Sequence, residues 1–343
     1  MTSNHATIQS KAHGQSDPSQ RTDNMSAECW PMNNQAGVAP RIAILLCTYQ
    51  GQRFLQEQLD SFMTQSHHNW ELWVSDDGSK DNTLDILERA KGQLGGRISI
   101  HNGPQNGFCA NFLSLACKAD IQADYYAYSD QDDVWAADKI SRALEWLEKV
   151  PKNVPALYCS RTRYISNKGN ELGYSAAFAR PPTFRNALVQ NIAGANTMIF
   201  NQAARELLIQ VPDHGDVISH DWVVYLLVTG CGGHVFYDPH PSVNYRQHGG
   251  GAVGQNVTIA AKLKRTRALL AGRFKYWNAA NIKVLSNFRS KLNEESCATL
   301  DYFIGARQNS IVLRMINFYR SGVYRQTILG NMGLFVAVLF NKI

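Results

Sequence analysis

Three carboxylates lie within four positions of the chain, at Asp130, Asp132 and Asp133. They follow residues 124–128, an aromatic-rich run that is typical of a β-strand. A strand that ends this way delivers its acids to one edge of a sheet, where α/β proteins build ligand sites. Like charges this close resist full ionisation unless a cation neutralises them, and oxygen ligands favour Mg²⁺ or Mn²⁺. The cluster therefore predicts a metal-diphosphate site, although an acidic cap on the helix expected near residue 137 would explain it too.

Two other polar pairs, Thr48-Tyr49 and Asp76-Asp77, also follow expected strands. Because adjacent parallel strands end at the same edge of a sheet, we expect both pairs in one crevice. An aromatic ring can stack on a base, and a carboxylate can accept the N3–H of uracil or thymine, which cytosine lacks. A turn with a helix cap would also account for Asp76-Asp77. Residues 47–51 offer one glycine where a dinucleotide fingerprint needs three, which disfavours a dehydrogenase.

Four further candidates come from loops and helix starts. Asn106 follows the third expected strand, where it could meet sugar or phosphate oxygens. Asp221 begins an expected helix far from the acidic cluster and could take a proton from a substrate hydroxyl. Before a run of three glycines, His248 could complete an oxygen-rich metal site and Arg246 could neutralise a departing diphosphate. An Asn-Gly turn, a helix cap and a surface loop are the plainer interpretations of Asn106, Asp221 and His248.

The order of elements brings these residues together. Strands separated by helical spacing are predicted at residues 42–47, 70–74, 98–100 and 124–128. Such alternation predicts an α/β fold, with a doubly wound, mainly parallel sheet and helices on both faces. After residue 151 the alternation becomes irregular, and we expect strands at 156–159 and 234–237, a mixed stretch at 192–200 and helices at 218–228, 258–280 and 300–319.

Composition predicts three regions. Residues 1–40 are polar and contain no apolar run that could serve as a signal peptide, which indicates a disordered leader. Residues 41–255 are expected to form one domain, with a nucleotide-binding half at 41–135 and an acceptor and catalytic half at 136–255. Residues 256–343 form a basic helical C-terminal region. Seven cysteines without regular spacing indicate reduced thiols.

The net charge of +6 is distributed unevenly. Residues 255–343 carry 14 lysines or arginines against three acids, a balance of +11, whereas the rest of the chain carries 20 basic and 25 acidic residues. A basic, apolar-rich tail predicts peripheral contact with an anionic membrane, on the cytoplasmic side of the inner membrane. The apolar segment at 329–340 is shorter than the roughly 20 residues that span a bilayer. No nucleic-acid motif accompanies the charge, so we expect no nucleic-acid partner.

Six motifs, taken in order, resemble those of family 2 inverting glycosyltransferases, and their residues are most similar to those of bacterial rhamnosyltransferases. The resemblance covers about residues 41–255, and it implies a GT-A fold, a nucleotide-diphosphate sugar donor, a divalent metal and transfer to a hydroxyl in one inverting displacement. The motifs are Leu46-Cys-Thr-Tyr-Gln-Gly51, Ser75-Asp-Asp-Gly-Ser79, Asn106-Gly-Phe108, Ser129-Asp-Gln-Asp-Asp-Val-Trp135, His220-Asp-Trp222 and Tyr245-Arg-Gln-His248.

The resemblance also implies roles for single residues. Tyr49 and Asp77 would hold the base, Asp130 the ribose or sugar side, and Asp132 the metal. In the second half, the catalytic base would be Asp221, and the late histidine that contacts metal or diphosphate would be His248. The sequence departs from the family pattern in two places. The glycines after His248 lack the asparagine that related sequences commonly have. Asp133 adds a third acid that could bind the metal in place of Asp132, but the motif register favours Asp132.

The leading hypothesis is therefore an enzyme that moves L-rhamnose from dTDP-rhamnose onto a cell-surface polysaccharide of the O-antigen or capsule type. The acceptor would be a glycan or a lipid-linked oligosaccharide. A UDP-hexose or UDP-N-acetylhexosamine donor is the nearest alternative, because uracil and thymine share the N3–H. A metal-dependent phosphoryl-transfer enzyme would need a phosphate-binding lysine loop, which we do not find. A catalytically silent glycan-binding module would not need Asp221.

Overall fold

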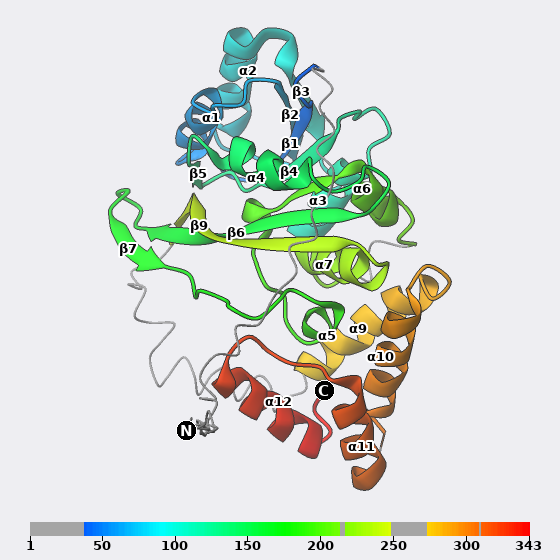
Figure 1. Ribbon diagram of the computed structural model, residues 1–343. Coiled ribbons are helices and arrows are strands. Elements are labelled where there is room, and N and C mark those ends of the chain that lie inside the picture. The colour runs from blue at the N-terminus through cyan, green and yellow to red at the C-terminus, as the bar shows by residue number, and fades with distance from the viewer. Residues whose placement is uncertain (1–37, 213–216, 248–272, 309) are drawn as a thin grey trace, which may run out of the picture. The chain divides into compact units, whose positions relative to one another are not determined.

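The computed structural model describes residues 38–212, 217–247, 273–308 and 310–343 of the protein (Figure 1). The expected leader up to residue 37, residues 258–272 of the helix expected over 258–280, and the loop from His248 onward lie outside the described residues. The strands are β1 (Ile42–Thr48), β2 (Trp70–Asp76), β3 (Ile98–Asn102), β4 (Tyr125–Ser129), β5 (Val134–Trp135), β6 (Ala156–Ile165), β7 (Glu171–Tyr174), β8 (Ile199–Asn201) and β9 (His234–Arg246).

The helices follow the same numbering along the chain. They are α1 (Leu55–Met63), α2 (Thr83–Leu94), α3 (Gly107–Ala116), α4 (Lys139–Leu147), α5 (Phe184–Ala187), α6 (Gln202–Ile209), α7 (His220–Gly230), α9 (Arg273–Asn287), α10 (Glu294–Gly305), α11 (Ile311–Ser321) and α12 (Ile328–Leu339), with short 3₁₀ turns at Gly95–Arg97 and Ala195–Thr197.

Strand β1 is the centre of the first half, and it is buried along its whole length. It pairs in parallel with β2 and β4, and β2 pairs in parallel with β3, which gives the order β3-β2-β1-β4. Ile44 and its alternate neighbours pack into a core with α1, α2 and α4, whereas Leu45 and its neighbours pack with α3, α6 and α7. The predicted α/β fold with helices on both faces is therefore confirmed.

The second half of the sheet is mixed in direction. Beyond β4 the order continues as β8-β6-β9-β5, in which β8 is antiparallel to both neighbours and β9 is parallel to β6. Strands β6 and β9 run well beyond the predicted 156–159 and 234–237, because they pair with each other through register shifts at Ser160–Thr162. All pairing in the first half of the sheet is thus parallel, whereas the second half combines the long parallel pair of β6 and β9 with short antiparallel pairs.

The C-terminal helices share the core of α7. Leu285, Phe288 and Phe303 belong to the same buried cluster as α3, α6 and α7, and the backbone N–H of Asn293 donates to the carbonyl oxygen of Gly230 (3.1 Å). The single helix predicted over 300–319 is wrong, since α10 ends at Gly305 and α11 begins at Ile311. Among the described residues, every helix falls short of the length and apolarity that a membrane crossing requires.

Candidate active site

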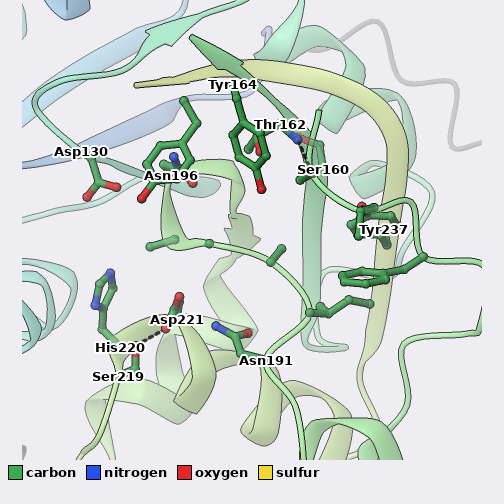
Figure 2. Close-up of a pocket in the computed structure, with 18 of the residues that line it drawn as sticks. Asp130, Ser160, Thr162, Tyr164, Asn191, Asn196, Ser219, His220, Asp221 and Tyr237 are labelled. Atoms are coloured by element: carbon green, nitrogen blue, oxygen red, sulfur yellow. Dashed lines mark hydrogen bonds between the residues drawn. The ribbon is translucent and has the colours of Figure 1, made fainter. Parts of the chain in front are cut away.

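Two cavities meet at the carboxyl end of the parallel strands. The first cavity, of about 730 Å³, lies between the loops that follow β1, β2, β3 and β4. The second cavity, of about 530 Å³, lies between β6 and the start of α7 (Figure 2). Phe108, Asp130 and Tyr245 line both cavities, so a ligand that fills one would reach the other beside these three side chains.

The end of β1 lines the first cavity through Thr48 and Tyr49. The Tyr49 ring is 57% exposed, as a platform for a base would be. Its backbone is fixed by Gln131, whose side-chain amide bonds both the N–H and the carbonyl oxygen of Tyr49 (2.8 Å each). A Cβ on Gly51 would lie 2.3 Å from the Gln131 amide oxygen, so a larger residue there would displace the side chain that holds Tyr49. Gln131 was not predicted as a site residue from the sequence, although it lies inside the acidic motif.

The neighbours Asp76 and Asp77 have different environments. Asp76 is 4% exposed and accepts hydrogen bonds from the Thr48 hydroxyl (2.7 Å) and from the hydroxyl and backbone N–H of Ser79 (2.6 and 2.8 Å). It closes the turn after β2 and does not line the first cavity. Asp77 does line it, and accepts from the backbone N–H of Gln105 (2.6 Å). The expectation that Asp76 contacts a ligand is therefore corrected, because its oxygens are committed to the turn.

The loop after β3 differs from its prediction. Asn106 is exposed at the N-terminus of α3, makes no capping bond through its side chain and does not line the first cavity. Its neighbours Gln105 and Gly107 line the cavity instead. Gln105 and Gln50, on two loops at this cavity, have positive φ angles of 54° and 53°. Such backbone strain in residues other than glycine is concentrated at functional sites.

The acidic cluster separates into three environments. Asp132 lines the first cavity, and Asp130 lines both cavities. Burial, together with the charges of Asp132 and Asp221, raises the pKa of Asp130 to about 7. Asp133 is fully buried and accepts from the Asn196 side-chain amide (2.5 Å) and the backbone N–H of Arg246 (3.2 Å). Burial and the neighbouring acids raise the pKa of Asp133 well above its usual range.

A buried cation, Lys139, accompanies the acidic cluster. Its ammonium group is fully buried, donates to the carbonyl oxygen of Asn196 (2.8 Å) and lies 3.2 Å from the centre of the Trp135 ring. Burial lowers the pKa of Lys139, and the charges of Asp133 and Asp130 oppose that shift. Sequence analysis missed this residue, because a lysine at a helix start usually faces solvent.

Arg246 does not face the diphosphate position that the sequence suggested. Its side chain is fully buried and forms an ion pair with Glu57 (2.6 Å). The guanidinium also donates to the carbonyl oxygen of Asp132 (2.9 Å) and lies over the ring of Phe54. Arg246 lines neither cavity. The expectation is therefore corrected: this arginine binds the backbone carbonyl of Asp132 and holds the loop of the acidic cluster in place.

Asp221 lines the second cavity from the first turn of α7 (Figure 2). Its Oδ1 accepts from the Ser219 hydroxyl and from the backbone N–H of Trp222 (2.7 Å). Within the described residues, Oδ2 forms no hydrogen bond that competes for a substrate proton. His248, the other expected metal ligand, lies outside the described residues. In the part of the chain that is described, no three His, Cys, Asp or Glu side chains gather into a metal site.

Comparison with known proteins identifies the family. The sequence model of glycosyl transferase family 2 matches residues 43–208. The dTDP-rhamnosyl transferase RfbG of Shigella flexneri is 30% identical over 232 residues, which cover 64% of this chain and 77% of that protein. The chain belongs to glycosyltransferase family 2 and is a glycosyltransferase with the α/β fold described above.

Two solved structures resemble the chain at low sequence identity. Staphylococcus aureus TarS 1–349 in complex with UDP-GlcNAc has a TM-score of 0.49 at 13% identity, over 83% of this chain and 93% of that one. The mannosyltransferase PcManGT of Pyrobaculum calidifontis, in complex with GDP-Man and Mn2+, has a TM-score of 0.46 at 17% identity, over 89% of each chain.

Proposed function

We propose that the protein transfers L-rhamnose from dTDP-rhamnose to a hydroxyl of a cell-surface polysaccharide acceptor, with inversion at the transferred carbon. The observation that carries the reaction class is the meeting of the two cavities at Asp130. The nucleotide would occupy the first cavity, the acceptor the second, and the transferred sugar the junction. The family membership and the name of the Shigella flexneri relative support the sugar and the nucleotide.

In the proposed reaction, Asp221 is the general base. An acceptor hydroxyl attacks the anomeric carbon of the donor sugar, while the bond from that carbon to the diphosphate oxygen breaks and the diphosphate leaves with the electron pair. The hydroxyl proton passes to Asp221, whose Oδ1 is held by Ser219 and Trp222 while Oδ2 is available. General-base catalysis of this kind contributes about 10²- to 10⁴-fold to a rate.

The base of the nucleotide would stack on Tyr49, with Asp77 accepting its N3–H. The exposure of the Tyr49 ring and the fixed position of Asp77 beside Gln105 support this arrangement. Asp130 would contact the ribose or the sugar, since it lies at the junction of the cavities.

The chemistry of the acidic cluster fits a divalent metal ion such as Mg²⁺ or Mn²⁺. Asp132 brings a carboxylate to the first cavity, whereas both oxygens of Asp133 already accept hydrogen bonds. Asp132 would therefore hold the ion, with His248 as a further proposed ligand. When bound, the ion supplies charge neutralisation for the diphosphate leaving group. Burial is the main cause of the raised pKa of Asp130, and the charges of Asp132 and Asp221 add a repulsion that such a cation would relieve.

Calorimetric titration with dTDP-rhamnose, UDP-glucose, UDP-N-acetylglucosamine and ATP, each with and without Mn²⁺, tests the proposal. We expect metal-dependent binding of dTDP-rhamnose and its loss in Asp132→Asn. Preferred binding of a UDP-sugar would change the donor but keep the reaction class. Metal-dependent binding of ATP alone would indicate phosphoryl transfer, and full function of Asp221→Asn would indicate a glycan-binding module.

We also propose that the C-terminal region contacts the cytoplasmic face of an anionic membrane. In this proposal, residues 41–255 form the catalytic domain and the C-terminal region attaches it to the membrane. The apolar face of α11 and α12 supports this contact, because its side chains are exposed while the Arg314 side chain of α11 is buried. By sequence, residues 255–343 carry a balance of +11, which complements acidic headgroups. The apolar face consists of Ile311, Val312, Leu313, Ile316, Tyr319, Ile328, Leu329, Met332, Phe335, Val336 and Phe340.

Sedimentation with phosphatidylglycerol-containing vesicles, compared with phosphatidylcholine vesicles, tests the membrane contact. The double variant Leu329→Ser, Phe335→Ser should bind on the order of 10² times more weakly, since each side chain contributes about 1.5 kcal/mol or more when buried. The matched control is Met63→Ser, Leu84→Ser, two exposed apolar residues of the catalytic domain. Equal binding of the two double variants would refute the proposal, as would a dimer that forms through the apolar face without any vesicle binding.

A further inference from the structure

His220 is a buried polar side chain that lines the second cavity next to Phe108, one of the three residues that line both cavities. It is the first residue of α7, is 4% exposed and lines the second cavity beside Asp221. Figure 2 shows its ring rising from the helix start on the side of the cavity where Asp130 lies. Both ring nitrogens of His220 are buried and lack a hydrogen-bond partner. Natural folds rarely leave two such atoms unpaired, unless a ligand pairs them.

The His220 ring is held rigidly by aromatic neighbours. It stacks on Phe112, with ring centres 4.1 Å apart and planes 9° from parallel, and it meets the edge of Tyr128 at 5.0 Å. Phe108, which is 65% exposed and lines both cavities, has its ring centre 6.0 Å from that of His220. The imidazole is thus fixed before a ligand arrives, so little side-chain entropy is lost when a hydrogen bond forms.

The charge state of His220 restricts the ligand that it can recognise. Burial lowers the pKa of His220 to about 4, so the ring is neutral near pH 7 and carries one N–H donor and one acceptor nitrogen. A phosphate would call for a cation, whereas a sugar hydroxyl, which both donates and accepts, matches a neutral imidazole. The acceptor's reacting hydroxyl belongs beside Asp221, and the diphosphate belongs beside Asp132. The ring hydroxyls of the transferred sugar are therefore the remaining groups that His220 could bind.

We propose that His220 hydrogen-bonds a ring hydroxyl of the donor sugar and thereby determines which sugar the enzyme accepts. This inference rests on the proposed function, because it requires a nucleotide-sugar donor across the junction of the cavities. Phe108 would provide the apolar wall against which a C–H face of the same pyranose lies. His220 is thus a specificity-determining residue, distinct from the base next to it in sequence.

Calorimetry with the full chain and Mn²⁺ tests this proposal through two ligands, dTDP and dTDP-rhamnose. In His220→Phe, which keeps the aromatic stack, dTDP should bind as in the unaltered protein while dTDP-rhamnose binds about 10 to 100 times more weakly. His220→Asn, which retains a donor and an acceptor, should recover part of that loss. His101→Phe is the matched control, since His101 also stacks on an aromatic ring, that of Trp73, but lines neither cavity.

The same experiment separates the ways in which the proposal could fail. If the unaltered protein does not bind dTDP-rhamnose, the proposed donor fails first. If it binds, but His220→Phe binds both ligands equally well, His220 has no role in donor recognition. Equal loss of dTDP and dTDP-rhamnose would make the histidine structural, and that outcome would overturn the proposal.

Donors that each lack one ring hydroxyl give a second measurement that does not depend on how well His220→Phe folds. The unaltered protein should lose about tenfold or more in affinity for one of these deoxy donors, and His220→Asn should lose less for that donor than for the others. A uniform loss across the series would contradict a hydrogen bond from His220.

Discussion

In most proteins, apolar side chains are buried and charged side chains are exposed. The catalytic cleft departs from this rule by burying polar side chains, and the apolar face of the C-terminal helices departs from it by exposing apolar ones. The cleft buries polar groups, such as Asp133, Lys139 and His220, inside an apolar scaffold. The apolar face leaves side chains such as Leu329 (71% exposed) in contact with solvent, while the same helical region buries Arg314. Each arrangement lowers the stability of the isolated chain, compared with a fold in which polar side chains are exposed and apolar side chains are buried.

The difference shows how each region depends on a partner. In the cleft, Asp133 and Lys139 have hydrogen-bond partners within the protein, whereas neither ring nitrogen of His220 has one, so a small polar ligand would complete its bonds. On the apolar face, no hydrogen bond is missing, and only the removal of apolar area from water would be gained. The cleft therefore favours a specific ligand, and the face favours an extended surface.

Asp221→Asn should produce the largest effect. Removing the proposed base should lower kcat by about 10²- to 10⁴-fold, equivalent to roughly 3–5 kcal/mol, because asparagine cannot accept the acceptor's proton. Nucleotide-sugar affinity should change little, since Asp221 lies in the second cavity and not in the first. Steady-state rates with a polysaccharide acceptor, combined with calorimetry of the donor, provide the measurement.

Asp85→Asn is the matched control, because Asp85 also lies in the first turn of a helix, α2, and lines neither cavity. A comparable fall in kcat in this control would indicate that loss of helix charge, and not loss of a base, explains the effect. Retention of kcat in Asp221→Asn would remove Asp221 from the proposed reaction.

Two leucines of α12 test the burial contrast within one helix. Leu334 is 2% exposed and packs into the core, whereas Leu329 is 71% exposed. Leu334→Ala should lower the free energy of unfolding by about 3 kcal/mol through lost contacts and a cavity. Leu329→Ala should change it by about 0.5 kcal/mol or less. Urea denaturation measures both, and a large loss in Leu329→Ala would mean that this side chain is already packed in solution.

The sequence predicted the parallel half of the sheet because its signals are local. Each strand from β1 to β4 is a short run rich in apolar or aromatic residues. A helix follows each of β1, β2 and β3, whereas the two-residue β5 lies between β4 and α4. The pairing of β6 with β9 depends on contacts between residues almost 80 positions apart, so the true length of these strands was hidden. Short elements such as β5 and α5 carry too few residues for a periodic pattern. The break between α10 and α11 was missed, although the sequence marks it with the polar run Ala306-Arg-Gln-Asn-Ser310, in which Ser310 is the N-cap of α11.

Candidate site residues could be recognised from the sequence where the residue type indicates a chemical role. The direction in which each side chain points could not be predicted. Asp76 and Asp77 are identical in type and adjacent, and only the turn geometry after β2 decides which one lines the cavity. Arg246 was chosen for its charge, yet its ion pair with Glu57 depends on the packing of α1. The support given by Lys139 and Gln131 also depends on tertiary contacts, which periodicity and motif spacing do not encode.

The pH dependence of stability tests the buried state of His220. Burial lowers the folded-state pKa to about 4 from 6.5, so the neutral ring stabilises the fold above pH 6.5, and this contribution is lost as the pH falls toward 4. Between pH 6.5 and 5 the unaltered protein should lose about 2 kcal/mol more than His220→Phe does. Urea denaturation at several pH values measures the difference. Parallel curves for the two proteins would show that the histidine is solvated.

The neighbours Asp132 and Asp133 provide the finest test, because the two side chains differ in environment and not in chemistry. Asp133→Ala should lower the free energy of unfolding by about 1–2 kcal/mol, since the Asn196 amide and the backbone N–H of Arg246 would lose their acceptor. Relief of repulsion with Asp130 offsets part of that loss. Asp132→Ala should leave stability within about 0.5 kcal/mol, yet abolish Mn²⁺-dependent donor binding, which Asp133→Ala should retain. If instead Asp133→Ala alone removes the metal dependence, the assignment of the ion to Asp132 is wrong, and the hydrogen bonds to Asp133 must open when the donor binds.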